Sequence, residues 1–396
     1  MKITEIQVVP FETTVDRISF GQLISDYPVV QTLTRVLTDE GVEGCYFGGH
    51  FHGDQDGLLP GDQALIRDFL GPFLTGRDPL DRAEIWRQLW AAKLPENVCS
   101  VIDLALWDLA GRASGLPVHK LLGGARDKVK AYASSFNNLG RPEDYAAHAA
   151  ECQRQGYRAY KIHPYHYWNP ATGQPALPRP SYVDWDIEAC RAVRSAVGDA
   201  MVLMFDPWGT YHNYADALRV GRELQRLGFY WYEHPMPETR VESYVRLAGE
   251  LDIPICSPEI AAGGIETRAD WILRGASDIS RIDVLRGGIT GVMKLAGMCE
   301  AVGMRCELHM SGFGNLQVLG ATSEDVCEYY ERGLLGPGAR YEAPPYLEAA
   351  CDPLDSAGFV AVPATPGLGY QIRWDYIEAH RLPDTQVEAV APLHPR

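Results

Sequence analysis

Five polar residues that can take part in chemistry each follow a short apolar run, at intervals of about 25 positions. The runs MVLMF, FYWY, PICSP, ISRI and MRCEL lead into Asp206, Glu233, Glu259, Asp283 and His309. Three carboxylates brought to one dry point raise each other's pKa unless a cation holds them. Hard oxygen ligands favour a small divalent ion such as Mg²⁺. The first three acids therefore predict one Mg²⁺ site.

The segments between these residues predict the elements that position them. Each interval contains an amphipathic stretch long enough for a helix. Continuous apolar runs are typical of buried parallel strands. A repeated strand and helix unit of this length predicts a β/α barrel, in which the chemistry lies at the C-terminal ends of the strands. The five polar side chains are therefore expected to meet at one barrel mouth.

Lys161 and His163 form a second candidate group on the strand AYKIH. They are two positions apart, so their side chains leave the strand on the same side. Near a bound carboxylate, Lys161 could stabilise negative charge, and His163 has a suitable intrinsic pKa for a general base. The alternative is a structural ion pair at Lys161 and a packed core histidine at His163.

Asp283 and His309 end neighbouring strands of the expected barrel. A carboxylate that is hydrogen-bonded to an imidazole fixes the tautomer of the imidazole and raises the imidazole's pKa, which favours acid–base chemistry. A purely structural pair is the alternative. Because Lys161/His163 lies early and Asp283/His309 late in the barrel, the two pairs should flank a substrate. The predicted reaction is removal of a proton next to a carboxylate, through an enediolate, with Mg²⁺ present.

The chain has 396 residues, which favours two domains. Residues 1–125 are predicted to form an α+β capping domain, and residues 126–354 the barrel. A turn-rich tail, 355–396, is expected to return to the cap. The segments RISFGQLISDYP and HFHGDQDGLLPG are interpreted as loops of the cap. The long Pro- and aromatic-rich segment after AYKIH is interpreted as a loop on the catalytic face.

The chain resembles the enolase superfamily, mandelate racemase subgroup, over nearly its whole length. The resemblance rests on MKITEIQ, IDLALWDLAGR, YWYEHP, SPEIAAGG, RIDVLRGGITG, CELHMSG and PGLGY. It implies a capping domain and a modified TIM barrel, (β/α)₇β, and it suggests a homo-oligomer. It also implies Mg²⁺ on Asp206, Glu233 and Glu259, with Asp283 and His309 as a catalytic dyad.

Three positions differ from the pattern of that family. The family often has Lys-x-Lys on the second barrel strand, where this chain has Lys161-Ile-His163, so the role of base could pass to His163. Trp208 stands where an Asn is common two residues beyond the metal-binding Asp. An acid is also expected on the last strand, and VCEYYERG offers Glu328 and Glu331, of which Glu328 is preferred as catalytic.

Further polar and aromatic residues in loops are candidates for substrate binding. Besides Glu331, the predicted contacts are His50, His52, Tyr165, His166, Trp208 and His212. These side chains suit a polyhydroxylated substrate, although each could also be an ordinary surface residue.

Composition narrows the range of partners. The net charge of −16 argues against a nucleic-acid partner. Neither a signal pattern nor an apolar run of membrane length is visible, so a cytoplasmic protein without a membrane partner is expected. The nine cysteines have no CxxC spacing and are interpreted as reduced thiols.

The leading hypothesis is a Mg²⁺-dependent lyase that dehydrates an acid sugar, an aldonate or aldarate, to a 2-keto-3-deoxy acid. A racemase, epimerase or cycloisomerase using the same enolate is the first alternative. A catalytically silent barrel that binds a metal or ligand is an alternative from another class. A metallohydrolase is disfavoured, because such barrels usually need several histidine ligands.

Overall fold

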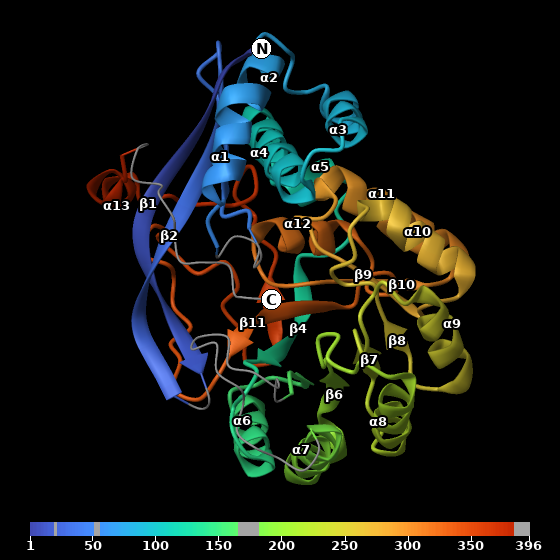
Figure 1. Ribbon diagram of the computed structural model, residues 1–396. Coiled ribbons are helices and arrows are strands. Elements are labelled where there is room, and N and C mark those ends of the chain that lie inside the picture. The colour runs from blue at the N-terminus through green and yellow to red at the C-terminus, as the bar shows by residue number, and fades with distance from the viewer. Residues whose placement is uncertain (20–21, 51–55, 165–181, 384–396) are drawn as a thin grey trace.

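The computed structural model describes residues 1–19, 22–50, 56–164 and 182–383. A parallel barrel surrounded by helices lies beside a smaller cap built on an antiparallel sheet (Figure 1). This confirms the predicted fold class. The division of the chain at residues 125 and 354 stays a prediction.

The cap consists of a three-stranded antiparallel sheet and a group of helices. Its strands are β1 (Ile3–Ser19), β2 (Gln22–Thr38) and β3 (Glu43–Phe47), in that order. Its helices are α1 (Pro60–Leu65), η1 (Ile66–Leu70, a π-helix), α2 (Gly71–Leu74), α3 (Arg82–Ala91), α4 (Glu96–Ser114) and α5 (Val118–Leu121).

The first hairpin is longer than the sequence suggested. RISFGQLISDYP was interpreted as a loop, but β1 continues to Ser19 and pairs with β2 from Gln22 onward. Pro10 lies within β1, paired with Thr32. A proline is tolerated on an edge strand, and β1 is the edge of this sheet.

The barrel consists of eight parallel strands in the order β10-β9-β8-β7-β6-β5-β4-β11. They are β4 (Lys128–Ser135), β5 (Ala159–Ile162), β6 (Val202–Phe205), β7 (Trp231–Glu233), β8 (Ile255–Cys256), β9 (Ile279–Ile282), β10 (Arg305–Leu308) and β11 (Tyr329–Leu335). The Cys306 amide donates to the Val326 carbonyl at 2.8 Å, and the Glu307 carboxylate accepts the amides of Glu328 and Tyr329. These bonds join β10 to the segment that enters β11.

Helices alternate with the barrel strands and cover their outer face (Figure 1). They are α6 (Pro142–Arg154), α7 (Tyr182–Val197), η2 (Gly198–Ala200, a 3₁₀ turn), α8 (Tyr214–Arg226), α9 (Val241–Glu250), α10 (Gly264–Arg274), α11 (Gly288–Val302) and α12 (Phe313–Ala321). After the barrel, β12 (Phe359–Ala361) pairs antiparallel with β4, and α13 (Trp374–His380) lies beside β1. Leu382 donates its amide to the Pro10 carbonyl at 2.9 Å, so the end of the described chain contacts the cap.

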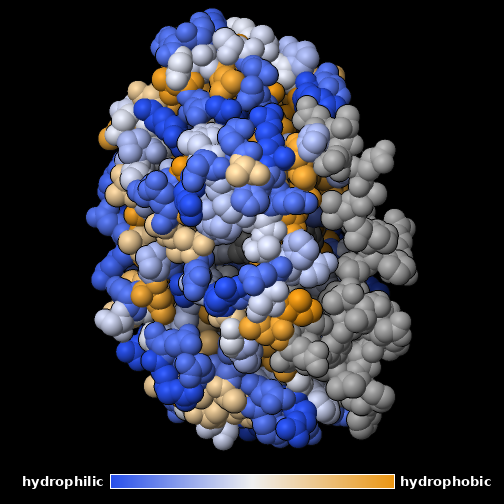
Figure 2. Space-filling view, turned by 90° about the vertical axis from the view of Figure 1, so that its left-hand side faces the viewer, coloured by the Kyte–Doolittle hydropathy of each residue, from blue (hydrophilic) through white to orange (hydrophobic). Residues whose placement is uncertain are grey.

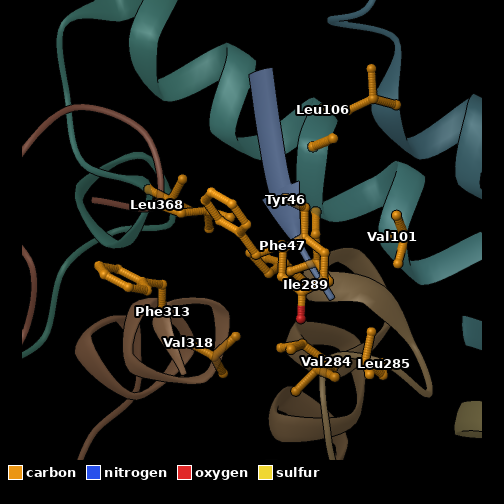
Figure 3. Close-up of a cluster of buried hydrophobic side chains, with 14 of the residues drawn as sticks. Tyr46, Phe47, Val101, Leu106, Val284, Leu285, Ile289, Phe313, Val318 and Leu368 are labelled. Atoms are coloured by element: carbon orange, nitrogen blue, oxygen red, sulfur yellow. The ribbon is translucent and has the colours of Figure 1, made fainter. Parts of the chain in front are cut away.

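The cap packs on the loop that follows β9 and on the first turn of α11. Asp103 of α4 accepts the amide of Thr290 at 3.0 Å and its hydroxyl at 2.6 Å. Around this contact, one apolar cluster joins the two parts (Figure 3). It includes Tyr46, Phe47, Val101 and Leu106 from the cap, and Val284, Leu285, Ile289, Phe313 and Val318 from the barrel. Val284 and Leu285 directly follow Asp283, so this packing also positions a candidate catalytic residue.

The surface over the cap sheet is mainly hydrophilic, with apolar side chains scattered across it (Figure 2). Among the described residues, no helix is both long and apolar enough to cross a membrane. All nine cysteines fall within the described ranges as free thiols, eight of them buried.

Candidate active site

The candidate residues gather at the C-terminal ends of the barrel strands. Asp206, Asp283 and His309 directly follow β6, β9 and β10, while Glu233 is the last residue of β7. Lys161 lies in β5 and is fully buried inside the barrel, whereas its neighbour Ile162 packs in the outer apolar layer. Parallel strands bring residues that are far apart in sequence to one rim in this way.

Lys161 is the central cation of the site. Its Nζ lies 3.1 Å from Asp206 Oδ2, 3.2 Å from Glu233 Oε2 and 2.8 Å from Glu331 Oε1. Burial alone would lower the pKa of Lys161, but the surrounding carboxylates, Glu233 first, outweigh it and raise the pKa well above its ordinary value. Lys161 is therefore held as an ammonium, suited to stabilising negative charge and not to removing a proton.

Arg281 is a second buried cation, which the sequence interpretation missed. Its Nη2 donates to Glu331 Oε2 at 2.7 Å and to the Tyr132 hydroxyl at 3.0 Å. Its Nε lies 2.7 Å from Glu233 Oε1, a charge contact that is not aligned as a hydrogen bond. An arginine within the short buried strand ISRI was the available signal. Lys161 and Arg281 together contact both oxygens of Glu233 and both oxygens of Glu331.

The group that could hold a metal differs in one member from the predicted triad. Asp206, His234 and Glu259 each offer one ligand atom, and these atoms lie within 4.8 Å of one another. Glu233, the remaining predicted ligand, is adjacent in sequence but contacts the two cations instead. The structure thus brings two of the three predicted acids together with a histidine that the sequence interpretation did not consider.

The charges around this group fit a divalent cation. Four buried carboxylates belong to the cluster, on Asp206, Glu233, Glu259 and Glu331. The permanent cations beside them are Lys161 and Arg281. The carboxylates outnumber these permanent cations by two; in this structure the imidazoles of His234 and His309 pair with Glu259, and a divalent ion could balance the same excess. Carboxylate oxygens are also the ligands that Mg²⁺ prefers.

His163 faces the group from β5. Its Nδ1 lies 2.6 Å from the Ser135 carbonyl oxygen, and its Nε2 lies 3.1 Å from Asp206 Oδ2. A carbonyl can only accept, so the proton on this side belongs to Nδ1. Nε2 is the atom that is directed at the cluster.

His309 faces the same group from β10. Its Nδ1 lies 2.8 Å from Asp283 Oδ2, and its Nε2 lies 2.9 Å from Glu259 Oε1. Burial would lower the pKa of His309, but Glu259 and Asp283 outweigh it and raise the pKa to about 10. The ring is therefore protonated near neutrality and can act as an acid.

The two acids considered for the last strand lie at opposite ends of it. Glu331 is buried in β11, with its Oε1 accepting the Ser134 hydroxyl at 2.7 Å besides contacting Lys161. Glu328 precedes β11 and contacts Lys130, Tyr230 and Arg305 at the N-terminal end of the barrel. Three residues of strand span about 10 Å. The preference for Glu328 is therefore corrected: Glu331 is the acid beside Lys161.

The structure describes only some of the residues that were predicted to contact the substrate. His52, Tyr165 and His166 lie outside the described residues. His50 is half-buried in the cap, and His212 is exposed on the loop before α8. Trp208 is half-buried beside the metal group, where its amide donates to Asp206 Oδ1 at 3.0 Å.

Two further buried residues fix the loop that carries Glu259, and neither was expected. The Glu238 carboxylate accepts the amides of Glu259, Ile260 and Ala261. From the other side, the Arg268 guanidinium donates to the Glu259 carbonyl at 2.8 Å. Neither residue has a distinctive spacing in the sequence, because their role depends on contacts across the loop.

Comparison with known protein families agrees with this architecture. Residues 7–123 match the N-terminal domain of the mandelate racemase and muconate lactonizing enzyme family. Residues 144–376 match the model described as enolase C-terminal domain-like. The chain therefore belongs to the enolase superfamily, in the mandelate racemase and muconate lactonizing enzyme group, which confirms the resemblance inferred from the sequence motifs.

Three individual relatives show which members of the superfamily the chain is similar to. The chain is similar to a crystal structure of D-glucarate dehydratase from Agrobacterium tumefaciens complexed with magnesium, with 39% identity, 96% of this chain and 99% of that chain covered, and a TM-score of 0.86. It is 27% identical to an arabinonate dehydratase of Saccharolobus solfataricus, over 90% of this chain and 92% of the relative. It is 30% identical to a D-galactarolactone cycloisomerase of Agrobacterium fabrum, over 81% and 85%.

Proposed function

We propose that the protein is a Mg²⁺-dependent acid-sugar dehydratase that converts an aldonate or aldarate to a 2-keto-3-deoxy acid. One observation carries the proposal. His163, directly after β5, and His309, directly after β10, each direct Nε2 at the carboxylate group, and strands β6 to β9 lie between them. Two proton-transfer groups on separate sides of a bound acid are what a loss of water requires, since one takes a proton and the other gives one.

The proposed reaction breaks two bonds of the substrate. His163 Nε2 accepts the proton from the carbon next to the carboxylate, and the electrons of that bond move toward the carboxylate. Lys161 stabilises the negative charge that develops there. Magnesium bound at this site would add positive charge at the same point.

His309 then donates its Nε2 proton to the hydroxyl on the adjacent carbon. That hydroxyl leaves as water, and the resulting enol becomes the 2-keto acid. Asp283 keeps the His309 ring oriented through Nδ1. Its Oδ1 is itself fixed, because it accepts the Leu285 amide at 2.6 Å.

An assay of 2-keto acid formation tests this proposal. The purified protein is incubated with Mg²⁺ and a panel of aldonates and aldarates, with a His309→Asn variant as control. We expect keto acid from at least one sugar with the parent protein and none with the variant. Absence of keto acid across the panel, in protein shown to bind Mg²⁺, would contradict dehydration.

A racemase, epimerase or cycloisomerase is the second candidate. The same paired imidazoles favour it, because a proton taken by one could be returned by the other to the opposite face. The cycloisomerase relative supports keeping it. Incorporation of solvent deuterium next to the carboxylate, with no keto acid formed, would select this candidate.

The substrate class implies a small-molecule carboxylate as partner. We further propose that the protein is cytoplasmic and forms a homo-oligomer. Its nine free thiols are compatible with a reducing compartment, and sedimentation of the purified chain would test the oligomeric state.

A further inference from the structure

We propose that Asn315, on α12, is a positioning residue that keeps His309 and Asp283 in the geometry needed to protonate the leaving hydroxyl. The inference rests on the dehydration proposed above, and Asn315 acts through His309 rather than on the substrate. The helix FGNLQVLGA carries two polar side chains, Asn315 and Gln317, and both are buried. Buried polar groups need hydrogen-bond partners, so the partners of each show what it holds.

The first argument is that Asn315 joins the segments that follow two neighbouring strands. Its Nδ2 donates to the carbonyls of His309 and Met310, at 2.7 and 2.9 Å. Its Oδ1 accepts the amide of Val284, the residue after Asp283, at 3.4 Å. Carbonyls only accept hydrogen bonds, so these partners also fix which way the amide group points. One side chain, 2% exposed, therefore bridges the ends of β9 and β10.

The second argument is the conformation of the turn after His309. Met310 has a φ of +65°, in the left-handed region that residues other than glycine rarely adopt. Its amide donates to Glu331 Oε2 at 2.6 Å, and its carbonyl accepts from Asn315. Such a conformation persists only where the surrounding contacts enforce it. Asn315 and Glu331 hold this residue from two sides, so loss of Asn315 should let the turn relax and carry the His309 ring with it.

The third argument is that the helix carrying Asn315 is itself closely packed. A Cβ on Gly314 would lie 2.9 Å from the Leu104 side chain of α4 and 3.1 Å from the Val284 side chain. The backbone of α12 therefore lies directly against the cap and against the segment that follows β9. Asn315 is held at a fixed place by this packing, and its side chain passes that position on to His309.

The geometry that Asn315 preserves is narrow. His309 Nδ1 lies 2.8 Å from Asp283 Oδ2, and in the proposed reaction its Nε2 donates to the leaving hydroxyl. The two residues follow different strands, so a small relative shift of the two segments would separate them. A misplacement of about 1 Å in an active site can reduce the rate about 10²-fold.

Gln317 offers a matched control on the same helix. Its Oε1 accepts the His119 amide at 2.7 Å, and its Nε2 donates to the carbonyls of Pro363 and Leu368 at 3.1 and 2.9 Å. Residues two apart on a helix do not face the same side. Both amide side chains are thus buried and each donates to two carbonyls, but only Asn315 holds the segments that carry His309 and Asp283.

The test compares Asn315→Leu with Gln317→Met in the full chain with Mg²⁺. Each variant replaces one buried amide by an apolar side chain of similar shape. Keto acid formation gives kcat and KM, and NMR in D₂O gives the exchange of the proton next to the carboxylate. Urea denaturation shows how much stability each variant has lost.

We expect both variants to unfold at lower urea concentration than the parent. Asn315→Leu should lower kcat for keto acid formation about 10–100-fold, with KM and proton exchange near the parent values. Gln317→Met should keep all three near the parent values. A parent kcat in Asn315→Leu, or an equal loss of kcat in both variants, would overturn the proposal. If Asn315→Leu does not fold, Asn315→Ser, with one donor on a shorter side chain, should lower kcat in the same selective way, and a parent kcat there would overturn the proposal too.

The His309 ring also gives a readout that does not need turnover, which separates this inference from the proposed function. In protein with ¹⁵N-labelled histidine, the Nδ1 proton hydrogen-bonded to Asp283 gives a downfield NMR signal, identified by its absence in His309→Asn. We expect Asn315→Leu to shift or broaden this signal and Gln317→Met to leave it in place. An unchanged signal in Asn315→Leu would overturn the positioning role even in an active dehydratase. A shifted signal, without keto acid from any acid sugar, would support the role and contradict dehydration.

Discussion

The two ends of the barrel both contain buried acids, but they balance the charge differently. At the N-terminal end, the Glu307 carboxylate accepts two backbone amides, and Glu328 contacts Lys130 and Arg305. At the C-terminal end, the four acids around Lys161 and Arg281 exceed the permanent cations by two charges. Buried acids alone therefore do not distinguish an active site. An excess of acids over lysine and arginine at one end does, because titratable imidazoles or a divalent ion must balance it.

The largest expected effect comes from removing a cation at the C-terminal end. Lys161→Met should reduce exchange of the proton next to the carboxylate by about 10³-fold or more, because stabilisation of the developing charge is lost. Exchange is measured by NMR in D₂O. Lys130→Met, at the other end, is the matched control and should retain the parent rate. An equal loss of proton exchange in both variants would show that the two ends of the barrel do not differ in their importance for the reaction.

His309→Asn should have the next largest effect, and it should separate two steps of the reaction. Keto acid formation should fall by about 10²–10⁴-fold because the acid that assists loss of the hydroxyl is missing. Exchange of the proton next to the carboxylate should persist, since His163 performs it. Loss of both activities to the same extent would place His309, and not His163, as the base.

At the N-terminal end, the expected effect is on stability and depends on pH. Burial raises the pKa of Glu307 to about 7, from an ordinary value of 4.5. Keeping the carboxylate charged therefore costs free energy above pH 7, and this cost disappears as the pH falls toward 4.5. Relative to Glu307→Gln, the parent should lose about 2–3 kcal/mol of unfolding free energy between pH 5 and pH 9.

Urea denaturation of the parent and Glu307→Gln at several pH values measures that difference. A difference that does not vary with pH would show that Glu307 is not the titrating group.

The smallest effect is expected from Glu328→Gln. This side chain lies in partly exposed ion pairs, which typically contribute about 0–1 kcal/mol. Keto acid formation should stay at the parent rate, whereas Glu331→Gln should abolish it by leaving Lys161 and Arg281 without a shared carboxylate. The two variants are compared in one keto acid assay, and a loss of activity in Glu328→Gln would return that residue to the site.

The strand ends could be predicted from the sequence because their pattern is local. A buried parallel strand is a continuous apolar run, and the first polar residue after it falls at the rim, as at Asp206 and Asp283. The family motifs also have a physical basis in the structure. Asp103, in the helix that contains ALWDLAGR, accepts a hydrogen bond from Thr290 of the GGITG motif. Asp108 of the same helix accepts the amide of Leu368 in the PGLGY motif.

Pairings across the barrel could not be predicted in the same way. Arg281 meets Glu233 and Glu331 through contacts between residues about 50 positions apart, and no spacing rule encodes them. The choice between Glu328 and Glu331 depends on where β11 begins. The two acids are only a few residues apart, and a sequence pattern does not locate the start of a strand that closely. His234 was missed because an acid beside it already matched the expected pattern.

The most direct test of the central claim is NMR of one reaction in D₂O, with and without Mg²⁺. The chain, freed of metal by a chelator, is mixed with an acid sugar that it turns over, and Mg²⁺ is then added. We predict no change before the addition, and afterwards a 2-keto acid carrying deuterium at the carbon that lost its hydroxyl. Product formed equally well without any divalent ion would contradict a site built around a metal at the charged end of the barrel.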